Sequence, residues 1–133
     1  MIEASLKKFS REGVQLELQR NDSEKLSLAD DLFDNVVDTF GMEYYLRPEK
    51  ALKEMSRVCK KGSRILLLTI GASSNTNYLK WFQKDKEEPY LREFGCFAVR
   101  DWDEIIKNSG LKILKEKREM DGTLYFYVLE NNK

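Results

Sequence analysis

Two carboxylates stand where a ligand could reach them, within residues 21–41, NDSEKLSLADDLFDNVVDTFG. Asp22 follows an alternating apolar run, and a second apolar run opens at Phe33-Asp34 and closes at Gly41. In parallel α/β sheets, ligands bind beyond the carboxyl ends of the strands, where a carboxylate can accept hydrogen bonds from them. The stretch therefore marks a candidate binding site at two successive strand ends.

The residue types that the chain lacks exclude several kinds of catalysis. There is no histidine, which removes Ser-His-Asp and Cys-His machinery, histidine-bound metals and the commonest general base. Cys59 and Cys96 are far apart and have no metal-ligand spacing. We therefore expect two free thiols, an intracellular reducing compartment and no metal site, and we assign no catalytic residue from the sequence.

Length and charge favour one ordinary domain. The 133 residues can bury a real core, and 23 basic residues balance 23 acidic ones. A net charge of zero gives no general attraction to nucleic acid or to an anionic membrane. No apolar run approaches the roughly 20 residues of a membrane helix, and the N-terminal segment, MIEASLKKFSREG, has the acidic residues of an ordinary helix rather than a signal peptide.

Hydrophobic periodicity predicts helices and strands in alternation. The predicted order is a helix ended by Gly13, a strand at 14–19 that is wet on one face, a strand at 34–40, a helix from Pro48 through Cys59 that Gly62 ends, a strand at 64–70, a helix capped by Asp101 and Glu104, and a hairpin with arms at 111–119 and 123–129. Between 71 and 100 the pattern is harder to read, although Tyr78, Leu79, Trp81 and Phe82 suggest a helix.

The three apolar strands predict how the sheet is buried. Residues 34–40, 64–70 and 123–129 are apolar on both sides of the pleat, which is typical of strands covered on both faces. The first arm of the hairpin is rich in charge, as befits a sheet edge. We therefore expect an α/β fold with a mostly parallel sheet that ends in an antiparallel hairpin.

Several segments, in this order and spacing, resemble the later two-thirds of a class I S-adenosylmethionine-dependent methyltransferase. They are NDSEKL at 21–26, FDNVVDTFG at 33–41, LKEMSRVCK at 52–60 running into RILLL at 64–68, Gly95-Cys96 before Arg100-Asp101, and GTLYF at 122–126. The subgroup that they resemble most is the methyltransferase-like branch that includes mitochondrial fungal proteins. The resemblance implies a partial Rossmann-like fold, S-adenosylmethionine as cofactor and a possible mitochondrial location.

The resemblance also assigns roles to the two strand ends. It implies that the carboxylate of Asp22 accepts a hydrogen bond from the adenine amino group and that backbone groups at Ser23 lie beside the ring. It implies that Thr39, Phe40 and Gly41 line the methionine half of the cofactor, where Gly41 allows close approach of the backbone because it has no Cβ.

Each role has a structural alternative. Asp22 could instead cap a short turn at Ser23-Glu24, and Asp38, within an apolar strand, needs a partner if it is buried. Asp34 is expected to hydrogen-bond locally in a structural role. We expect the aromatic cluster Tyr78, Trp81 and Phe82 to be part of the core rather than of a substrate pocket. We expect Glu54 and Arg57 to lie on the solvated face of their helix.

The chain also departs from the family pattern. It has no glycine before Gly13, and so lacks the glycine-rich turn that approaches the methionine part of the cofactor. Lys61-Gly62-Ser63 replaces the usual Pro-Gly-Gly, and Thr69 and Ile70 stand where relatives often place an acidic residue and a histidine. The resemblance thus predicts a single domain over 1–133 that is incomplete at its N-terminal side.

Three hypotheses follow. The chain supplies the adenine-side part of a cofactor site and is active only when another polypeptide completes it, or it is a non-catalytic interaction subunit of a larger assembly, or it is part of a longer methyltransferase. We expect the sheet order hairpin edge, 123–129, 64–70, 34–40. The free edge of 34–40 is then covered by another chain, by a second copy, or by 14–19.

Overall fold

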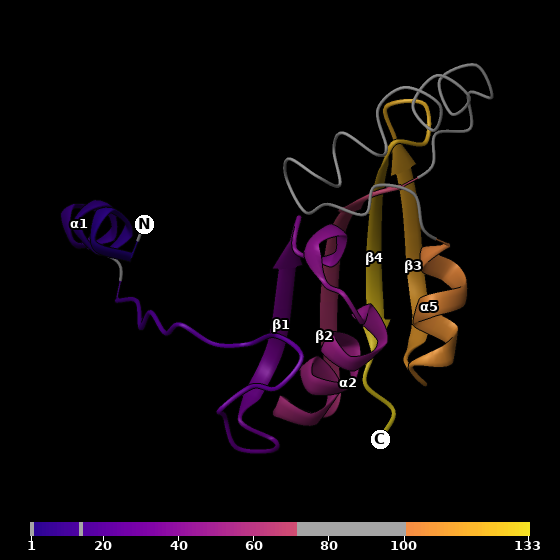
Figure 1. Cartoon of the computed structure of the whole chain (residues 1–133), viewed down its shortest axis with the longest axis horizontal. Helices are drawn as coiled ribbons and strands as arrows, with labels where there is room; N and C mark the ends of the chain where they lie inside the picture. The colour runs from indigo at the N-terminus through magenta and orange to yellow at the C-terminus, as the bar shows by residue number, and fades with distance from the viewer. Residues whose placement is uncertain (1, 14, 72–100) are drawn as a thin grey trace.

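The computed structural model describes residues 2–13, 15–71 and 101–133 (Figure 1). The elements, in chain order, are α1 (Ile2–Arg11), β1 (Phe33–Thr39), the 3₁₀ helix η1 (Met42–Tyr44), α2 (Pro48–Val58), β2 (Cys59–Ile70), α5 (Trp102–Asn108), β3 (Lys112–Glu119) and β4 (Leu124–Glu130). The residues proposed from sequence as an aromatic cluster, Tyr78, Trp81 and Phe82, lie outside the described residues, as does Cys96. Cys59 is buried and free.

The four strands form one sheet in the order β1-β2-β4-β3, which confirms the predicted order. β1 runs parallel to β2, whereas β2 with β4 and β4 with β3 are antiparallel. The α/β fold class is confirmed, and the sheet is mixed. Its parallel part is limited to the β1–β2 pair because residues 15–19 form no strand.

The crossover between β1 and β2 is made by α2, as a parallel pair requires. Pro48 begins this helix, where its missing N–H is not needed. The prediction that the helix continues through Cys59 to a stop at Gly62 is wrong, because β2 already begins at Cys59. Cys59 is extended and pairs with Phe33, and Gly62 donates its N–H to the carbonyl of Asn131, so both residues belong to the sheet.

The core fills one face of the sheet, under α2 and α5 (Figure 1). The Asp101 side chain caps α5 by accepting from the N–H of Glu104 at 3.0 Å, as predicted. Buried residues from both helices meet alternate residues of β2 and β4, and the set comprises Leu52, Met55, Ile65, Leu67, Trp102, Ile106, Tyr127 and Leu129.

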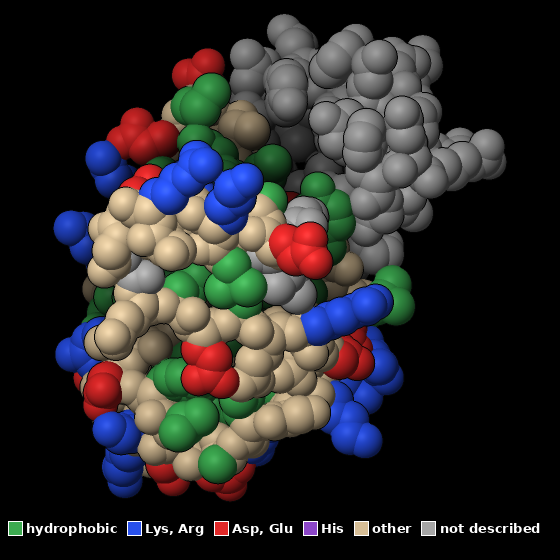
Figure 2. All heavy atoms as spheres, turned by 90° about the vertical axis from the view of Figure 1, so that its left-hand side faces the viewer, with side chains coloured by type: hydrophobic (Ala, Val, Ile, Leu, Met, Phe, Trp, Pro, Cys, Tyr) green, Lys and Arg blue, Asp and Glu red, His purple; other side chains and the backbone are tan. Residues whose placement is uncertain are grey.

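The opposite face of the sheet is partly open. Val37 of β1 is 67% exposed, and Leu66 of β2 and Phe126 of β4 are also exposed on this side. The prediction that these strands are covered on both faces is therefore wrong for the described part of the chain. No described helix packs on this face, and α1 lies apart from the sheet (Figure 1). Figure 2 views the molecule from the α1 side and shows apolar side chains at the surface there.

The predicted strand at 14–19 is also wrong as far as it is described. Residues 15–19 are extended but join no sheet, and most of their side chains are exposed. The alternation does place every second polar side chain on one side, because Gln19 bonds to Glu17 at 2.5 Å and Asn21 bonds to Gln19 at 3.4 Å. An extended segment without a neighbouring strand gains no ladder hydrogen bonds, so the pattern alone does not make a strand. The predicted helix before it is confirmed as α1.

Candidate functional site

The end of β1 makes a sharp turn through Thr39, Phe40 and Gly41. Phe40 has a φ of 54°, a left-handed conformation that a bulky residue adopts only under constraint. Its N–H is held by the carbonyl of Leu68 at 2.8 Å, and η1 starts two residues later. Such strained backbone costs on the order of 1–3 kcal/mol and is concentrated at binding sites. The turn is therefore a backbone sign of a site, and it stands at the carboxyl end of a parallel strand.

Gly41 lies directly against Asp38 and Tyr45. A Cβ built on Gly41 would overlap Asp38 Oδ1 and Tyr45 Oη and would lie 3.0 Å from Asp38 Cγ. Its φ of −97° suits any residue, so sterics rather than backbone freedom require glycine here. The family resemblance implied that the missing Cβ lets the backbone approach the cofactor closely. In the structure, the space is already used by two side chains of the same protein.

Asp38 is buried and bonded on one side only. Its carboxylate accepts a hydrogen bond from the Tyr45 hydroxyl at 2.9 Å, which supplies the partner that a buried Asp38 was expected to need. Only 9% of the residue is exposed, and Oδ2 has no hydrogen-bond partner among the described residues. Burial raises the pKa of Asp38, although the bond from Tyr45 opposes this effect. Burial and the nearby Asp38 carboxylate also raise the pKa of Tyr45.

Glu43 is a second buried carboxylate, which the sequence analysis missed. It is only 1% exposed, and its Oε1 accepts from the N–H of Ile70 at the end of β2. Trp102 donates its indole N–H to the carbonyl of Ile70 at 2.7 Å. Glu43 Oε2 has no partner within the described ranges. The Glu43 side chain thus bonds η1, which follows the end of β1 in the chain, to the carboxyl end of β2.

The turn at Asp22 and Ser23 is the other predicted part of the site. Asp22 is exposed, and its Oδ1 accepts from the N–H of Glu24 at 2.9 Å, so the turn-capping alternative is present in the structure. The Asp22 carbonyl also accepts from Lys25 at 3.0 Å. Ser23, beside Asp22, is half-buried.

The chain after this turn is anchored on α2 by charged side chains. Glu24 accepts from both the backbone N–H of Arg47 at 2.8 Å and its Nε at 2.6 Å, and these bonds lower the pKa of Glu24. Arg57 donates to the carbonyls of Leu26 and Leu28 at 3.0 and 2.8 Å. The turn is thus held at a fixed position beside the helix.

Arg57 and Glu54 form the centre of this anchor. Arg57 also bonds Asp30 at 2.6 Å and Glu54 at 2.8 Å, and the pKa of Arg57 is raised by these two carboxylates. Glu54 in turn accepts from the N–H of Leu26 at 2.8 Å. The prediction that both residues form a solvated helix face is wrong, because backbone groups of 26–28 lie against them. The expectation that Asp34 caps or hydrogen-bonds locally is wrong, because its carboxylate makes an exposed ion pair with Lys60 of β2 at 2.6 Å.

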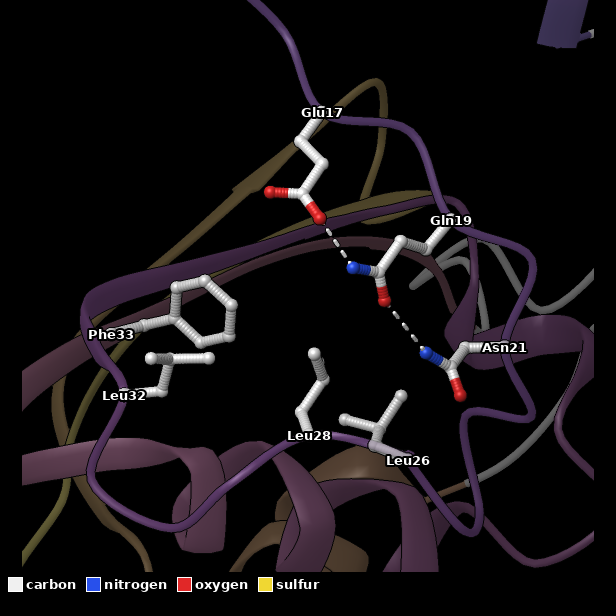
Figure 3. A pocket seen from close by; sticks show the side chains of 7 residues that line it. All are labelled: Glu17, Gln19, Asn21, Leu26, Leu28, Leu32 and Phe33. Carbon is white, nitrogen blue, oxygen red and sulfur yellow. Dashed lines mark hydrogen bonds between the residues drawn. The ribbon is translucent and has the colours of Figure 1, made fainter.

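A pocket of about 450 Å³ lies beside the start of β1 (Figure 3). One wall carries the row of hydrogen-bonded side chains from the extended segment, and the facing wall is apolar. The lining residues are Glu17, Gln19, Asn21, Leu26, Leu28, Leu32 and Phe33. It separates the extended segment from the sheet edge where the predicted strand would have paired. Within the described ranges, no group of three or more acidic or cysteine side chains is placed to hold a metal ion.

Comparison with known proteins places this arrangement in a family. The sequence pattern of the methyltransferase domain matches residues 1–67, just over half of the chain. The chain belongs to the class I S-adenosylmethionine-dependent methyltransferase family. The mitochondrial methyltransferase OMS1 of Saccharomyces cerevisiae is 29% identical over 96 residues, which are 72% of this chain and 20% of that protein. The ubiquinone/menaquinone biosynthesis C-methyltransferase UbiE of Klebsiella pneumoniae is 28% identical over 137 residues, covering 98% of this chain and 46% of that protein.

Solved structures share the fold at lower identity. The PH0226 protein of Pyrococcus horikoshii superposes with a TM-score of 0.72 at 18% identity, covering 97% of this chain and 66% of that one. A methyltransferase of Haloferax volcanii, solved with the Trm112 methyltransferase activator, gives 0.70 at 12% identity and covers 95% and 67%. The methyltransferase-family chain described here spans less than half of either curated relative.

Proposed function

We propose that this methyltransferase-family chain provides the adenine-side part of an S-adenosylmethionine site, which a further polypeptide completes. One observation carries the proposal. The outer edge of β1 pairs with no described strand, although it leads directly into the strained turn at Phe40. An open parallel edge with an exposed Val37 is a surface that proteins normally cover.

The residues at the two turns suit the adenine and methionine parts of the cofactor. Asp22 is exposed, and its turn uses Oδ1, while a carboxylate can accept several hydrogen bonds, including one from an amino group. The tight turn at Thr39, Phe40 and Gly41 presents backbone at the carboxyl end of a parallel strand, where ligands of such sheets bind. S-adenosylmethionine supplies an electrophilic methyl group when it is bound. This chain would orient the cofactor and leave the methyl acceptor to the completed site.

The alternative is a non-catalytic interaction subunit, and a specific observation favours it. Thr69 is fully buried, and among the described residues its hydroxyl donates to the adjacent Ile70 carbonyl alone, at 3.5 Å. The end of β2 thus presents no acidic or basic side chain of its own. Exposed apolar residues on the open sheet face, including Leu66 and Phe126, would serve a binding surface equally well.

The compartment is part of the same proposal. The yeast relative is mitochondrial, and we extend that location to this chain. Among the described residues, no helix has the length and apolar character needed to cross a membrane.

Calorimetry with S-adenosylhomocysteine tests the proposal. The chain alone should bind more weakly than micromolar, the affinity that corresponds to about −8 kcal/mol, because in this proposal another polypeptide supplies the other side of the site. Its complex with a partner recovered by gentle native purification should bind more tightly. Micromolar affinity of the chain alone would contradict the need for completion, and a complex that binds no cofactor would favour the interaction subunit.

Asp22→Ala should weaken cofactor binding to the complex by about 1–3 kcal/mol, because the adenine amino group loses its acceptor. Asp34→Ala is the matched control, since it removes another exposed carboxylate, which pairs with Lys60. Equal losses of affinity in the two variants, with the fold intact, would show that Asp22 has no specific role.

A further inference from the structure

The open face of the sheet has apolar residues on its inner strands and lysines on its outer strand, β3. The strand register places four residues side by side in one row across this face: Val37, Leu66, Val128 and Lys115. The next row on the same face, two residues along each strand, consists of Thr39, Leu68, Phe126 and Lys117. Each row is therefore apolar on β2 and β4 and ends in a cation on β3.

A pocket of about 330 Å³ makes this face concave beside the lysines. Its lining residues are Lys115, Lys117, Glu119, Phe126 and Val128. Lys117 pairs with Glu119 at 2.5 Å, whereas Lys115 makes no ion pair with any described residue. Phe126 is 38% exposed. The pocket thus offers an apolar recess next to a positive charge that the described part of the chain does not neutralise.

We propose that this open face is a docking surface for an amphipathic helix of another polypeptide, with acidic residues on the flank that lies over β3. The apolar stripe of such a helix packs on β2 and β4, and one of its side chains enters the recess. The proposal is separate from the cofactor site, and its test uses no cofactor.

The dimensions of the face suit one helix. The rows span three strand spacings, about 14 Å, and a helix with its side chains is about 10–12 Å across, so its flank reaches the lysines. Lys115 and Lys117 are separated by about 7 Å along the strand, and helix positions i and i+4 are about 6 Å apart along the axis. Two acidic residues at i and i+4 can therefore pair with both lysines.

The charges of α1 make it the wrong helix for this surface, although its Leu6 is exposed. α1 contains the basic residues Lys7, Lys8 and Arg11 and one acidic residue, Glu3. Lys7 and Arg11 have the i and i+4 spacing at which the lysines of β3 require acids, so α1 of this chain or of a second copy would bring like charges together. The recess also suits a protruding side chain of a partner better than a bilayer, into which a protein inserts side chains of its own.

Two synthetic helical peptides test the surface on the full chain. They share a leucine stripe and differ only at the flanking positions i and i+4, which are Glu in one peptide and Lys in the other. In NMR titrations, the Glu peptide should shift the amides of β2 and β4 and should bind at least about tenfold more tightly than the Lys peptide. Equal affinities, or shifts confined to other elements, would overturn the proposal.

Charge reversal separates this docking from general apolar binding. Lys115→Glu combined with Lys117→Glu should reverse the preference, so that the Lys peptide binds more tightly, and the milder pair Lys115→Gln with Lys117→Gln should make the two affinities similar. Lys53→Glu combined with Lys107→Glu is the control, because these exposed lysines belong to α2 and α5 on the other side of the sheet. A preference for the Glu peptide that survives both changes at positions 115 and 117 would refute the assignment.

Two measurements test the other occupants of the face. The chain should not sediment with vesicles of phosphatidylcholine and phosphatidylglycerol, and sedimentation that is lost in Lys115→Gln with Lys117→Gln would identify a membrane surface instead of a helix site. Nuclear Overhauser contacts between Leu6 and either Leu66 or Phe126 should be absent in the free chain. Their presence would show that α1 occupies the face, and the proposal of an external helix would fail.

Discussion

Gly41→Ala should destabilise the protein through one defined contact. The new Cβ would overlap Asp38 Oδ1 and Tyr45 Oη, whose mutual hydrogen bond is 2.9 Å long. The backbone at Gly41 has a φ of −97°, which alanine adopts without strain. The cost therefore comes from displaced side chains and not from the backbone conformation.

The magnitude follows from what must move. Asp38 and Tyr45 have to separate, which breaks a hydrogen bond to a buried carboxylate worth about 1.5–3 kcal/mol. Forcing a methyl group into a filled site costs about 1–3 kcal/mol, and part of this is the same displacement. We expect a loss of about 2–4 kcal/mol in the free energy of unfolding, which is large beside a total of roughly 5–15 kcal/mol.

Urea unfolding in an Asp38→Ala background isolates the contact. Removing the carboxylate frees the Tyr45 hydroxyl to move, so Gly41→Ala should cost less than about 1 kcal/mol there, a coupling that a double-mutant cycle measures. Gly110→Ala is the control, since its φ is 85° and nothing lies within 4 Å of its Cβ position. It should cost about 1 kcal/mol in either background. Equal costs for Gly41→Ala with and without Asp38 would refute the reasoning.

Three further outcomes test other parts of the structure. Burial raises the pKa of Asp38, so the protonated carboxyl stabilises the fold below its ordinary pKa of about 4, and this stability is lost as the pH rises through the raised pKa. In urea unfolding, the free energy of unfolding of Asp38→Asn should therefore rise relative to that of the wild type from about pH 4 upward. Arg57→Ala should lower the free energy of unfolding by about 2–3 kcal/mol, because the carbonyls of Leu26 and Leu28 lose a charged donor. The control Lys53→Ala, on the exposed side of α2, should change it by less than about 0.5 kcal/mol, and similar losses in both variants would show that Arg57 does not anchor this segment. The N–H of Phe40 bonds to β2, and the amides of Val36 and Asp38 face the same way because N–H groups two residues apart in a strand point to the same side. Amide exchange measured by NMR should therefore be slow at Val36 and Asp38 and fast at Val37 and Thr39, whose amides face the open edge, and slow exchange at all four would show that the edge is covered.

Elements whose signals are local could be predicted from the sequence. Pro48 begins α2, Asp101 caps α5, and the turn at Met120 to Gly122 takes three successive positive φ values that close the hairpin. The sheet order followed from the number of apolar strands and from the charged hairpin arm. Each of these signals depends on a few neighbouring residues, and so it is readable without the tertiary structure.

The errors concern features that depend on a distant partner. Alternation at 15–19 specifies which side chains share a face, but a strand also requires an adjacent backbone to bond. Continuous apolar residues in β2 suggested cover on both faces, yet only the face under α2 and α5 is covered in the described part of the chain. Apolar residues in a strand indicate that the strand tends to be buried, but they do not show which helix or strand packs on each of its faces.

Within the candidate site, the sequence drew attention to Asp22 and Gly41 by their positions but did not indicate their partners. Glu43 looks in sequence like an ordinary exposed residue of a turn. Its burial depends on η1 folding back onto the N–H of Ile70, 27 positions further along the chain. Tyr45 is equally silent in sequence, because its hydroxyl reaches Asp38 only when the chain after β1 turns back through η1.

A partner that pairs with the open edge of β1 would have a different effect from one that packs on the open face of the sheet. A strand added to β1 would lie about 4.8 Å from it and would pass beside Val37 and Thr39 toward the turn at Phe40. A strand that pairs with this edge would thus also bring a second backbone to the turn that we propose for the methionine part of the cofactor. A partner that packs only on Leu66 and Phe126 would bury apolar surface without reaching that turn. Stability and cofactor affinity should therefore rise together if the chain is half of an enzyme, and stability alone should rise if it is a scaffold.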